Sequence, residues 1–450
     1  MPESIHAVAV IGGATSGAEI AGRLAEQGVE VVVFEQNALP YGKIMDGLPR
    51  WHEALRRKEY ENVNAKLGRP GIHFVPGTRI GRDVPFAELA REWGFTAVVL
   101  ASGAWNDRPL PIEGAEQWVG RGLVYQNPFI IWFNHANETG YQGERFVPQD
   151  GAIVVGGGLA SIDVAKVFML ENVRAKLAER GIEVGTIQLE VKGIPKILAA
   201  HDLVYEDLGL AGCTLFYRRR AEDMPLVEIP VGVSPERREK MIASRGKVLA
   251  KAMEKYRFGF EPLAAPDGLL VEDDRLVGLR FRRTRIEDGR VVATDETFER
   301  RGSCVVSSIG SIPVPMEGIP MKGELYDFAD WELGRLSDYP NVFSVGNIVT
   351  GKGNIVASRK HASAVAQRVI ESYLGLGEDG RADEAGLLDG PKAKAAGQAE
   401  RIAGALSLAP PIEPAVLESI RKRVRERQAA VGYDGDYAAW IARMTPPDLE

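Results

Sequence analysis

Short apolar runs recur along the chain, and each ends in small residues or is followed directly by glycine. Ala7–Ile11, Phe95–Ala104 and Gly151–Val155 are examples. Continuous runs of this length are typical of parallel strands that are covered on both faces. Between them lie segments such as Ala18–Ala25, in which apolar residues recur at helical spacing. The pattern predicts an α/β fold made of strand–turn–helix units.

The first unit has every part of a dinucleotide-binding turn. Ala7–Ile11 leads into the turn Gly12–Gly17, a helix follows, and the next strand, Val31–Phe34, ends at Glu35. Glycines allow a tight turn and close helix–strand packing, and the helix N-terminus offers N–H groups to a pyrophosphate. The expected binding residues are Gly12, Gly13, Ala14, Ser16, Gly17 and Glu35.

Glu35 indicates which dinucleotide this first turn binds. A carboxylate there accepts hydrogen bonds from the two ribose hydroxyls and repels a 2′-phosphate. We therefore expect a dinucleotide whose adenosine ribose is not phosphorylated, and we assign it as FAD. Ala14 departs from the usual pattern, which has a second glycine there so that the backbone approaches the phosphate. The alternative interpretation is a strand–helix turn that binds no ligand.

A second unit repeats the pattern with a different ending. Gly151–Val155 precedes a glycine turn and a helix, and the next strand, Thr214–Tyr217, runs into consecutive arginines. Guanidinium groups at this position bind the 2′-phosphate of NADP. The sequence therefore predicts NADPH here, although a solvated basic loop is the alternative. The expected binding residues are Gly156, Gly158, Leu159, Ala160, Ser161, Arg218 and Arg219.

Three further segments are expected to complete the sheet of the first unit: Phe95–Ala104, Cys304–Gly310 and Asn341–Asn347. A glycine-rich bend then opens a helix from Val356 to Leu374, whose N-terminus would face the flavin or its ribityl chain. The expected fold is two Rossmann-like domains, with an NADP domain (residues 119–304) inserted into a discontinuous FAD domain (residues 1–118 and 305–375). Binding residues expected in these closing segments are Ser102, Gly103, Gly346, Asn347, Gly353 and Ile355.

Residues 376–450 are expected to form a linker and a helical C-terminal extension. Gly377–Gly390 is rich in glycine and acidic residues, which is typical of a linker. Pro414 then starts a helix in which Leu417, Ile420 and Val424 share one stripe among arginines. The extension is either a helical tail packed on the body or a docking element for a partner or a second subunit.

Composition excludes several classes of function. A net charge of −7 gives no support to nucleic-acid binding, which favours basic domains. Cys213 and Cys304 form no CxxC pair, and two cysteines are too few for an iron–sulfur cluster. No apolar run approaches the length of about 20 residues that spans a bilayer, so no membrane insertion is expected. Without a signal peptide pattern, we expect a cytoplasmic protein.

From Ala7 to Leu374 the chain resembles the adrenodoxin reductase-like NADPH–ferredoxin reductases and the small-subunit-like proteins of glutamate synthase. Leu39–Ile44, Trp132–Asn134 and Tyr217–Pro225 carry the resemblance. It implies that Gly42, Lys43 and Ile44 wrap the flavin and that His52 and Glu228 are catalytic. The chain departs from the family at Asn347, where many relatives have Asp or Trp. It also lacks the cysteine-rich N-terminal region of the glutamate synthase subunit.

The predicted function is an NADPH-dependent FAD flavoprotein reductase that passes electrons to a ferredoxin-like or other one-electron protein acceptor. Arg280, Arg282 and Arg421 are the expected cations of a docking face for an acidic carrier. One alternative is an electron-input subunit that binds FAD and NADPH and serves a catalytic partner subunit. Another is a nucleotide-binding sensor without turnover. The sequence does not define the acceptor, the pathway or the oligomeric state.

Overall fold

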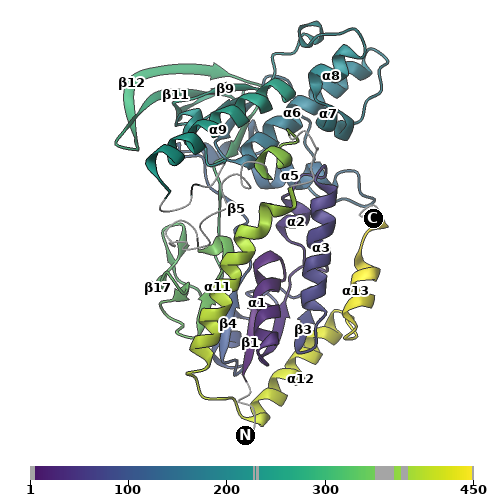
Figure 1. Ribbon diagram of the computed structural model, residues 1–450, viewed down its shortest axis with the longest axis vertical. Coiled ribbons are helices and arrows are strands. Elements are labelled where there is room, and N and C mark those ends of the chain that lie inside the picture. The colour runs from purple at the N-terminus through teal and green to yellow at the C-terminus, as the bar shows by residue number, and fades with distance from the viewer. Residues whose placement is uncertain (1–5, 227–228, 230–232, 350–368, 377–383, 448–450) are drawn as a thin grey trace.

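The computed structural model describes residues 6–226, 229, 233–349, 369–376 and 384–447. Two sheets made mainly of parallel strands organise these residues. One has seven strands in the order β17-β18-β19-β4-β1-β2-β3, and the other has five in the order β6-β13-β7-β8-β9. Figure 1 shows the first sheet with its helices in the lower half of the view and the second unit above it. The predicted α/β fold with two Rossmann-like units is confirmed.

The first sheet is parallel apart from two strands at one edge. Val10 of β1 lies between Val33 of β2 and Val99 of β4, and α1 forms the crossover from β1 to β2. The strands are β1 (Ala7–Ile11), β2 (Glu30–Phe34), β3 (Ile72–Val75), β4 (Ala97–Leu100) and β19 (Val342–Ser344), with β17 (Phe328–Asp330) and β18 (Arg335–Leu336) antiparallel. The helices between them are α1 (Thr15–Glu26), α2 (Lys43–Asp46), α3 (Glu53–Leu67) and α4 (Phe86–Arg91).

Both faces of the first sheet are buried. Val8 and Val10 belong to one hydrophobic cluster, together with the inner faces of α1 and α3. Ala9 and Ile11, which point to the other face, belong to a second cluster that includes α4. Because every residue of β1 meets apolar neighbours, the strand is continuously apolar rather than alternating.

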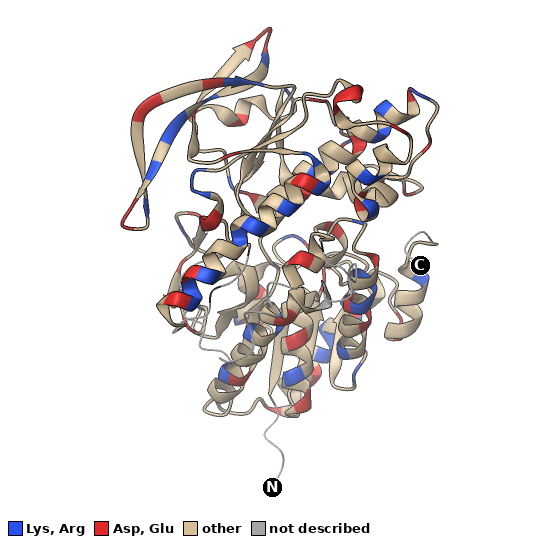
Figure 2. Cartoon of the chain, turned by 45° about the horizontal axis from the view of Figure 1, so that its top comes forward, with Lys and Arg blue, Asp and Glu red and all other residues tan. Residues whose placement is uncertain are grey.

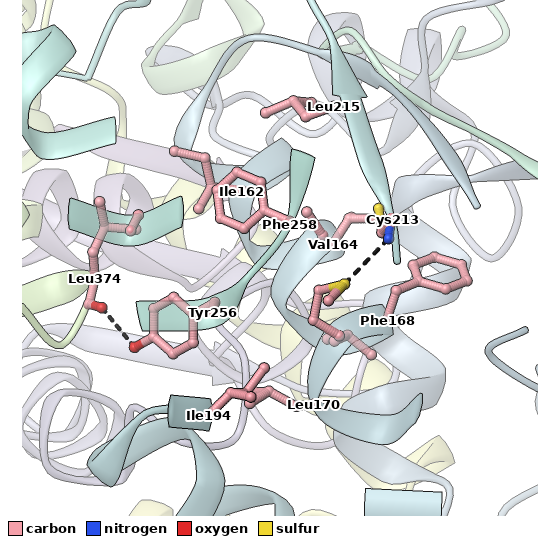
Figure 3. Packing of buried hydrophobic residues seen from close by; sticks show 14 of the residues in the cluster. Ile162, Val164, Phe168, Leu170, Ile194, Cys213, Leu215, Tyr256, Phe258 and Leu374 are labelled. Atoms are coloured by element: carbon pink, nitrogen blue, oxygen red, sulfur yellow. Dashed lines mark hydrogen bonds between the residues drawn. The ribbon is translucent and has the colours of Figure 1, made fainter. Parts of the chain in front are cut away.

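The second sheet is parallel throughout and carries most of the remaining helices. Its strands are β6 (Leu123–Tyr125), β13 (Val305–Ser308), β7 (Ile153–Gly156), β8 (Thr214–Phe216) and β9 (Gly259–Glu261). Its helices are α5 (Gln126–His135), α6 (Leu159–Ala178), α7 (Thr186–Lys192), α8 (Ile194–Ala199) and α9 (Pro235–Tyr256). Figure 3 shows Ile162, Val164 and Phe168 of α6 in the hydrophobic core that also contains Leu215 and Phe258.

Smaller elements complete the chain. A three-stranded antiparallel sheet extends from the second unit as a long hairpin, seen at the upper left of Figure 1. Its strands are β10 (Ala264–Glu272), β11 (Arg275–Glu287) and β12 (Arg290–Arg301). Two short pairs are β5 (Asn106–Asp107) with β14 (Ser311–Ile312), and β15 (Met321–Lys322) with β16 (Leu325–Tyr326). The 3-10 helices are η1 (Ala115–Trp118), η2 (Tyr205–Leu208), η3 (Ala221–Asp223), η4 (Gly346–Ile348) and η5 (Glu384–Leu388).

One strand belongs to a different sheet from the one expected. Cys304–Gly310 was expected to complete the first sheet, but its strand β13 lies between β6 and β7 of the second sheet. Val305 and Val306 are buried there with apolar neighbours on both faces, an environment that either sheet offers. The expectation for this strand is therefore wrong. The boundaries of the domains as a whole stay a prediction.

The C-terminal extension is helical and lies on the first unit, as Figure 1 shows. It comprises α11 (Asp389–Leu406), α12 (Pro414–Ala430) and α13 (Tyr437–Met444). The predicted helix start at Pro414 is confirmed. Of the expected linker, residues 377–383 lie outside the described residues, and residues 384–390 are helical rather than open.

Candidate dinucleotide-binding sites

The turn after β1 is closed by contacts that exclude a side chain. Gly12 has φ +100°, and a Cβ there would lie 2.7 Å from the carbonyl oxygen of Ala101. A Cβ on Gly17 would lie 1.9 Å from the carbonyl oxygen of Gly12. Helix α1 therefore sits directly on the turn, and only glycine fits at these two positions.

The N-terminus of α1 is open to an anion. Its N-cap residue is Ala14, which has extended backbone angles and no side chain able to accept from the helix N–H groups. The first turn of α1 contains no acidic residue. The uncapped N–H groups and the helix dipole together favour a negative group at this end.

Glu35 lies at the mouth of this turn and is bonded to it. Its Oε2 accepts a hydrogen bond from the N–H of Gly13 at 2.9 Å, and its Oε1 accepts one from the N–H of Asn37 at 2.9 Å. The residue is 5% exposed, and burial raises the pKa of its carboxyl group. The acid thus ties the end of β2 to the glycine turn.

Several of the other predicted residues gather around the same turn. Gly42, at φ +46°, lies against Ala14, because a Cβ on Gly42 would be 3.0 Å from the Ala14 Cβ. A Cβ on Gly346 would be 2.7 Å from the Ser16 Oγ. Ser102 follows β4, and its Cα would be 3.1 Å from a Cβ on Gly12. The turn is therefore walled by segments from three separate parts of the chain.

The remaining predicted residues of the first site have different surroundings. Gly103 has φ +74° and lies beside the Trp105 indole, whose Nε1 donates to the carbonyl oxygen of Ser102 at 2.9 Å. Ile44 is buried in the core beneath α1, and Asn347 is exposed. Gly353, Ile355 and Glu228 lie outside the described residues.

Lys43 belongs to a polar cluster at the junction of the two sheets. Its Nζ donates to Asn127 Oδ1 and to Ser311 Oγ, both at 3.2 Å, and lies 5.3 Å from the centre of the Trp105 ring. Burial lowers the pKa of Lys43, against the attraction of Asp107. Burial raises the pKa of Asp107 to about 6, and its Oδ2 accepts from the N–H of Asn127 at 3.1 Å.

Sequence reasoning missed Asp107, Asn127 and Ser311. They come from β5, α5 and β14, and β5 pairs with β14 where the chain passes between the two sheets. None of them forms a recognisable motif with its neighbours. The three residues come together only in the fold, so no sequence signal marks this cluster.

The second glycine turn, after β7, is equally tight. A Cβ on Gly156 would lie 2.4 Å from the carbonyl oxygen of Ser308, and one on Gly157 would lie 2.1 Å from the Tyr217 ring. Gly158 is the N-cap of α6, where a Cβ would meet nothing within 4 Å. Like α1, α6 begins without a side-chain cap or an acidic residue in its first turn. An anion is therefore favoured at Gly158, and Leu159 and Ala160 form the first turn beside it.

Ser161 stabilises the second glycine turn from its buried side. It is 0% exposed, and its Oγ donates to the carbonyl oxygen of Gly158 at 2.6 Å. The small side chain allows α6 to lie close to β7, since a Cβ on Gly156 would be 2.7 Å from the Ser161 Cβ. Ser161 thus takes the packing position of the third glycine of the usual pattern.

The three arginines after β8 are not equivalent. Arg220 is paired with Asp223, its Nε donating to Oδ2 at 3.0 Å and its Nη2 to Oδ1 at 3.1 Å. Arg219 donates from Nη2 to the carbonyl oxygen of Gly289, at the tip of the β11–β12 hairpin, at 3.1 Å. Arg218 is exposed. Arg218 and Arg219 are therefore the better placed of the three to meet an added phosphate.

His52 is fully buried at the N-terminus of α3. Its Nε2 accepts from Trp51 Nε1 at 2.9 Å, and its ring is stacked on Tyr373 with 4.1 Å between the ring centres. The Tyr373 hydroxyl donates to Asp163 Oδ2 of α6 at 2.5 Å. The structure thus connects His52 with the core of the second unit, and its catalytic role stays a prediction.

The predicted docking cations are already paired within the chain. Arg280 and Arg282 both donate to Asp267, at 3.2 and 3.0 Å from their Nε atoms, and Arg421 donates to Glu30. Along β11, Leu279 and Phe281 alternate with these two arginines, and both apolar side chains are buried, as the alternation of a strand predicts. Figure 2 shows both signs of charge along the long hairpin. These residues therefore do not form a purely basic face.

Two Rossmann-like units, each with a glycine turn before an uncapped helix, are typical of α/β proteins that bind dinucleotides. Residues 6–194 match the family described as pyridine nucleotide-disulphide oxidoreductase. The predicted resemblance to ferredoxin–NADP reductases and to the glutamate synthase small chain is confirmed by the proteins that the chain matches.

Among curated proteins, the chain is 28% identical over 168 residues to cindoxin reductase of Citrobacter braakii, covering 36% of this chain and 34% of that one. It is 28% identical over 171 residues to the glutamate synthase [NADPH] small chain of Bacillus subtilis, covering 37% and 33%. The aligned part thus spans about a third of the length of these relatives. A probable ferredoxin/ferredoxin–NADP reductase of Mycobacterium bovis is 24% identical over 399 residues, covering 83% and 65%.

Among solved structures, Mycobacterium tuberculosis FprA in complex with NADPH superposes with a TM-score of 0.59 at 21% identity. The superposition covers 94% of this chain and 90% of FprA. At this identity the likeness shows that the fold is shared. Within the described residues, no helix is both long and apolar enough to cross a membrane, and no group of three or more His, Cys, Asp or Glu is arranged to hold a metal ion.

Proposed function

We propose that the chain is an NADPH-dependent FAD flavoprotein reductase that delivers electrons to a ferredoxin-like or other one-electron protein acceptor. One observation carries the proposal: two glycine turns of the same design are followed by opposite charges, Glu35 at the first and Arg218–Arg219 at the second. A carboxylate selects an unmodified ribose and guanidinium groups select a 2′-phosphate. Two sites of this kind suit two different dinucleotides.

The first site fits FAD. Gly12, Gly13 and Gly17 allow the backbone to approach a pyrophosphate, and the N-terminus of α1 stabilises its charge. Glu35 would accept from the ribose hydroxyls while its bond to Gly13 holds it in place. Ala14, Ser16, Gly42, Ser102, Gly103, Gly346 and Asn347 form the wall, with Ile44 supporting it from the core. FAD held there would supply the change from hydride transfer to one-electron transfer that this reaction requires.

The second site fits NADPH. Gly156, Gly158 and the first turn of α6, Leu159–Ser161, would hold the pyrophosphate. Arg218 and Arg219 would form charge-assisted hydrogen bonds to the 2′-phosphate. The carbonyl of Gly289 orients the Arg219 guanidinium without neutralising its charge.

The Lys43 cluster supplies a half-buried positive charge where the two sheets meet. Asn127 and Ser311 fix the Lys43 ammonium by hydrogen bonds, and Asp107 attracts it. We propose that Lys43 stabilises negative charge on a flavin bound at the first site. We also propose that His52, at the N-terminus of α3, is catalytic. Glu228, Gly353 and Ile355 remain predicted contributors outside the described residues.

Names of relatives support both this function and its alternative. Ferredoxin–NADP reductase and cindoxin reductase support a reductase with a protein acceptor, whereas the glutamate synthase small chain supports an electron-input subunit. For the subunit alternative, the sequence offered the C-terminal extension as a docking element. That extension packs on its own chain, which favours the reductase. The cytoplasm is its proposed location.

A direct experiment tests the proposal. The purified protein should be yellow, release FAD rather than FMN on denaturation, and oxidise NADPH when ferricyanide is supplied as an acceptor. NADPH should also reduce a ferredoxin through the protein. A folded protein that takes up neither FAD nor NADPH would refute the proposal, whereas one that binds both without oxidising NADPH would favour the sensor.

A further inference from the structure

The apolar residues of the C-terminal extension are buried against the rest of the same chain. Leu417, Ile420 and Val424 of α12 join the hydrophobic cluster on one face of the first sheet. The inner residues of α11 and α13 join the cluster on the other face; they are Ala395, Ala399, Ile402, Leu406 and Trp440. The apolar stripe of α12, which the sequence suggested as a docking surface for a partner, is therefore already covered by the first sheet.

Ion pairs fix the extension to β2 and α3. Arg421 donates from Nε and Nη2 to the two carboxylate oxygens of Glu30, at 2.7 and 2.6 Å. Burial would raise the pKa of Glu30, but hydrogen bonds from His73 and Arg421 outweigh it and lower the pKa to about 2. On the other side, Lys392 lies 2.6 Å from the buried carboxylate of Glu59. These contacts place α12 and α11 on opposite sides of the glycine turn's sheet.

Helix α13 contacts the segment that follows Glu35. Trp440 is 4% exposed, and its Nε1 donates to the carbonyl oxygen of Ala38 at 2.8 Å. The Tyr437 hydroxyl donates to Asn64 Oδ1 at 2.8 Å, and Asn64 Nδ2 donates to the Tyr41 hydroxyl at 3.0 Å. Figure 1 shows α13 lying beside β3 and α3. The extension thus holds Ala38 directly and Tyr41 indirectly, through Asn64 of α3.

This segment forms one wall of the first glycine turn. It lies between Glu35 and Gly42, and Gly42 lies against Ala14. Between them, the Pro40 Cβ is 2.9 Å from the position that a Cβ on Gly13 would take. Through Trp440, helix α13 therefore contacts the stretch of chain that leads from Glu35 to Gly42.

We infer that α13 is a positioning element for the adenosine side of the first dinucleotide site, acting through Trp440 and Tyr437. The inference rests on the proposed function, because it assumes that FAD occupies this site. Segment 38–41 is ordered by the extension during folding, so that binding does not have to order it. A wall that is ordered in advance lowers the entropic cost of binding.

Two conservative substitutions test the inference. Trp440→Phe keeps an aromatic ring and removes the N–H donor, and Tyr437→Phe removes only the hydroxyl. Each should raise the Kd of FAD by about two- to tenfold, the range that one hydrogen bond supports, and the double variant should raise it further. The Kd is measured by flavin fluorescence on apoprotein, together with the Kd of NADPH and the Tm of the apoprotein. Lys422→Ala, an exposed position of α12, is the control.

A weaker FAD affinity with NADPH affinity and apoprotein Tm retained would support the inference. Two results would overturn it: unchanged FAD affinity in both folded variants, or a parallel loss of FAD affinity, NADPH affinity and Tm, which would indicate general destabilisation. If wild type binds FAD normally and the variants match it, the proposed function stands and only this inference fails. If wild type binds no FAD, the proposed function fails and takes the inference with it.

Discussion

Glu35 accepts a hydrogen bond from the N–H of Gly13, so the acid that ends β2 is joined directly to the turn that follows β1. The contact has two consequences. It places a carboxylate at the mouth of an uncapped helix, and it makes that carboxylate part of the turn's own structure. Substitution of Glu35 should therefore affect both binding and stability.

Glu35→Gln should weaken FAD binding about tenfold or more, since hydrogen bonds to a charged group contribute about 1.5–3 kcal/mol. The amide retains one acceptor oxygen, but its NH₂ group would face an N–H donor, either Gly13 or Asn37. The Tm should fall as well. Flavin fluorescence and thermal unfolding measure the two effects. Glu26→Gln, an exposed residue of α1, is the control. Equal FAD affinity in both variants would contradict the assigned role.

Arg218→Ala and Arg219→Ala should each lower the preference for NADPH over NADH. Loss of both should reduce the preference by about a hundredfold, from about 1.5 kcal/mol for each charge-assisted bond. NADH turnover with ferricyanide should remain, because only the 2′-phosphate contacts are lost. Arg220→Ala is the matched control, since this arginine already pairs with Asp223. If all three variants behave alike, the arginines form a solvated basic loop, as the alternative interpretation held.

The parts of the fold that were predicted correctly are local. The sequence from Ala7 to Glu35 contains a strand, a turn, a helix and a strand, and its two strands pair with each other. Which sheet β13 joins depends instead on its pairing with Leu123 of β6 and Ile153 of β7, which lie far away in sequence. An apolar strand fits either sheet, so its residues alone do not choose between them.

The same limit applies to the candidate site. Glycine turns follow from spacing, but the Lys43 cluster joins residues from α2, β5, α5 and β14. The extension presents a similar case. Its helix starting at Pro414 followed from the pattern, yet only the fold shows that Trp440 reaches the carbonyl of Ala38. Contacts between segments remote in sequence have no periodic signature.

Cys213→Ser and Cys304→Ser should each leave NADPH-to-ferricyanide electron transfer largely intact. Both thiols are free, and burial raises the pKa of Cys213 well above its usual range and that of Cys304 to about 11. Since the thiolate is the reactive form, neither is suited to a thiol relay. Cys213→Ser should still lower the Tm, because a hydroxyl would replace an apolar group at a fully buried position. Loss of flavin reoxidation in a folded variant would instead indicate a thiol step.

The last prediction concerns Asp107 and the pH dependence of stability. Burial raises its pKa from 3.8 to about 6, so the folded protein holds this proton more tightly than the unfolded chain does. Between these two pH values the native state binds more protons, and the free energy of unfolding falls as pH rises. The stabilisation from Asp107 is thus present below about pH 4 and is lost by about pH 6.

Asp107→Asn removes this titration while retaining an acceptor oxygen for the N–H of Asn127. The Tm of the variant relative to wild type should therefore rise from pH 4 to pH 6 and level off above that range. Asp83→Asn gives the opposite case, because Arg82 lowers the pKa of Asp83 to about 2, and this variant should be less stable than wild type throughout the same window. Thermal unfolding of the three proteins at half-unit pH steps measures both differences. A flat difference for Asp107→Asn would show that Asp107 titrates normally and that the junction beside Lys43 is more solvated than its hydrogen bonds indicate.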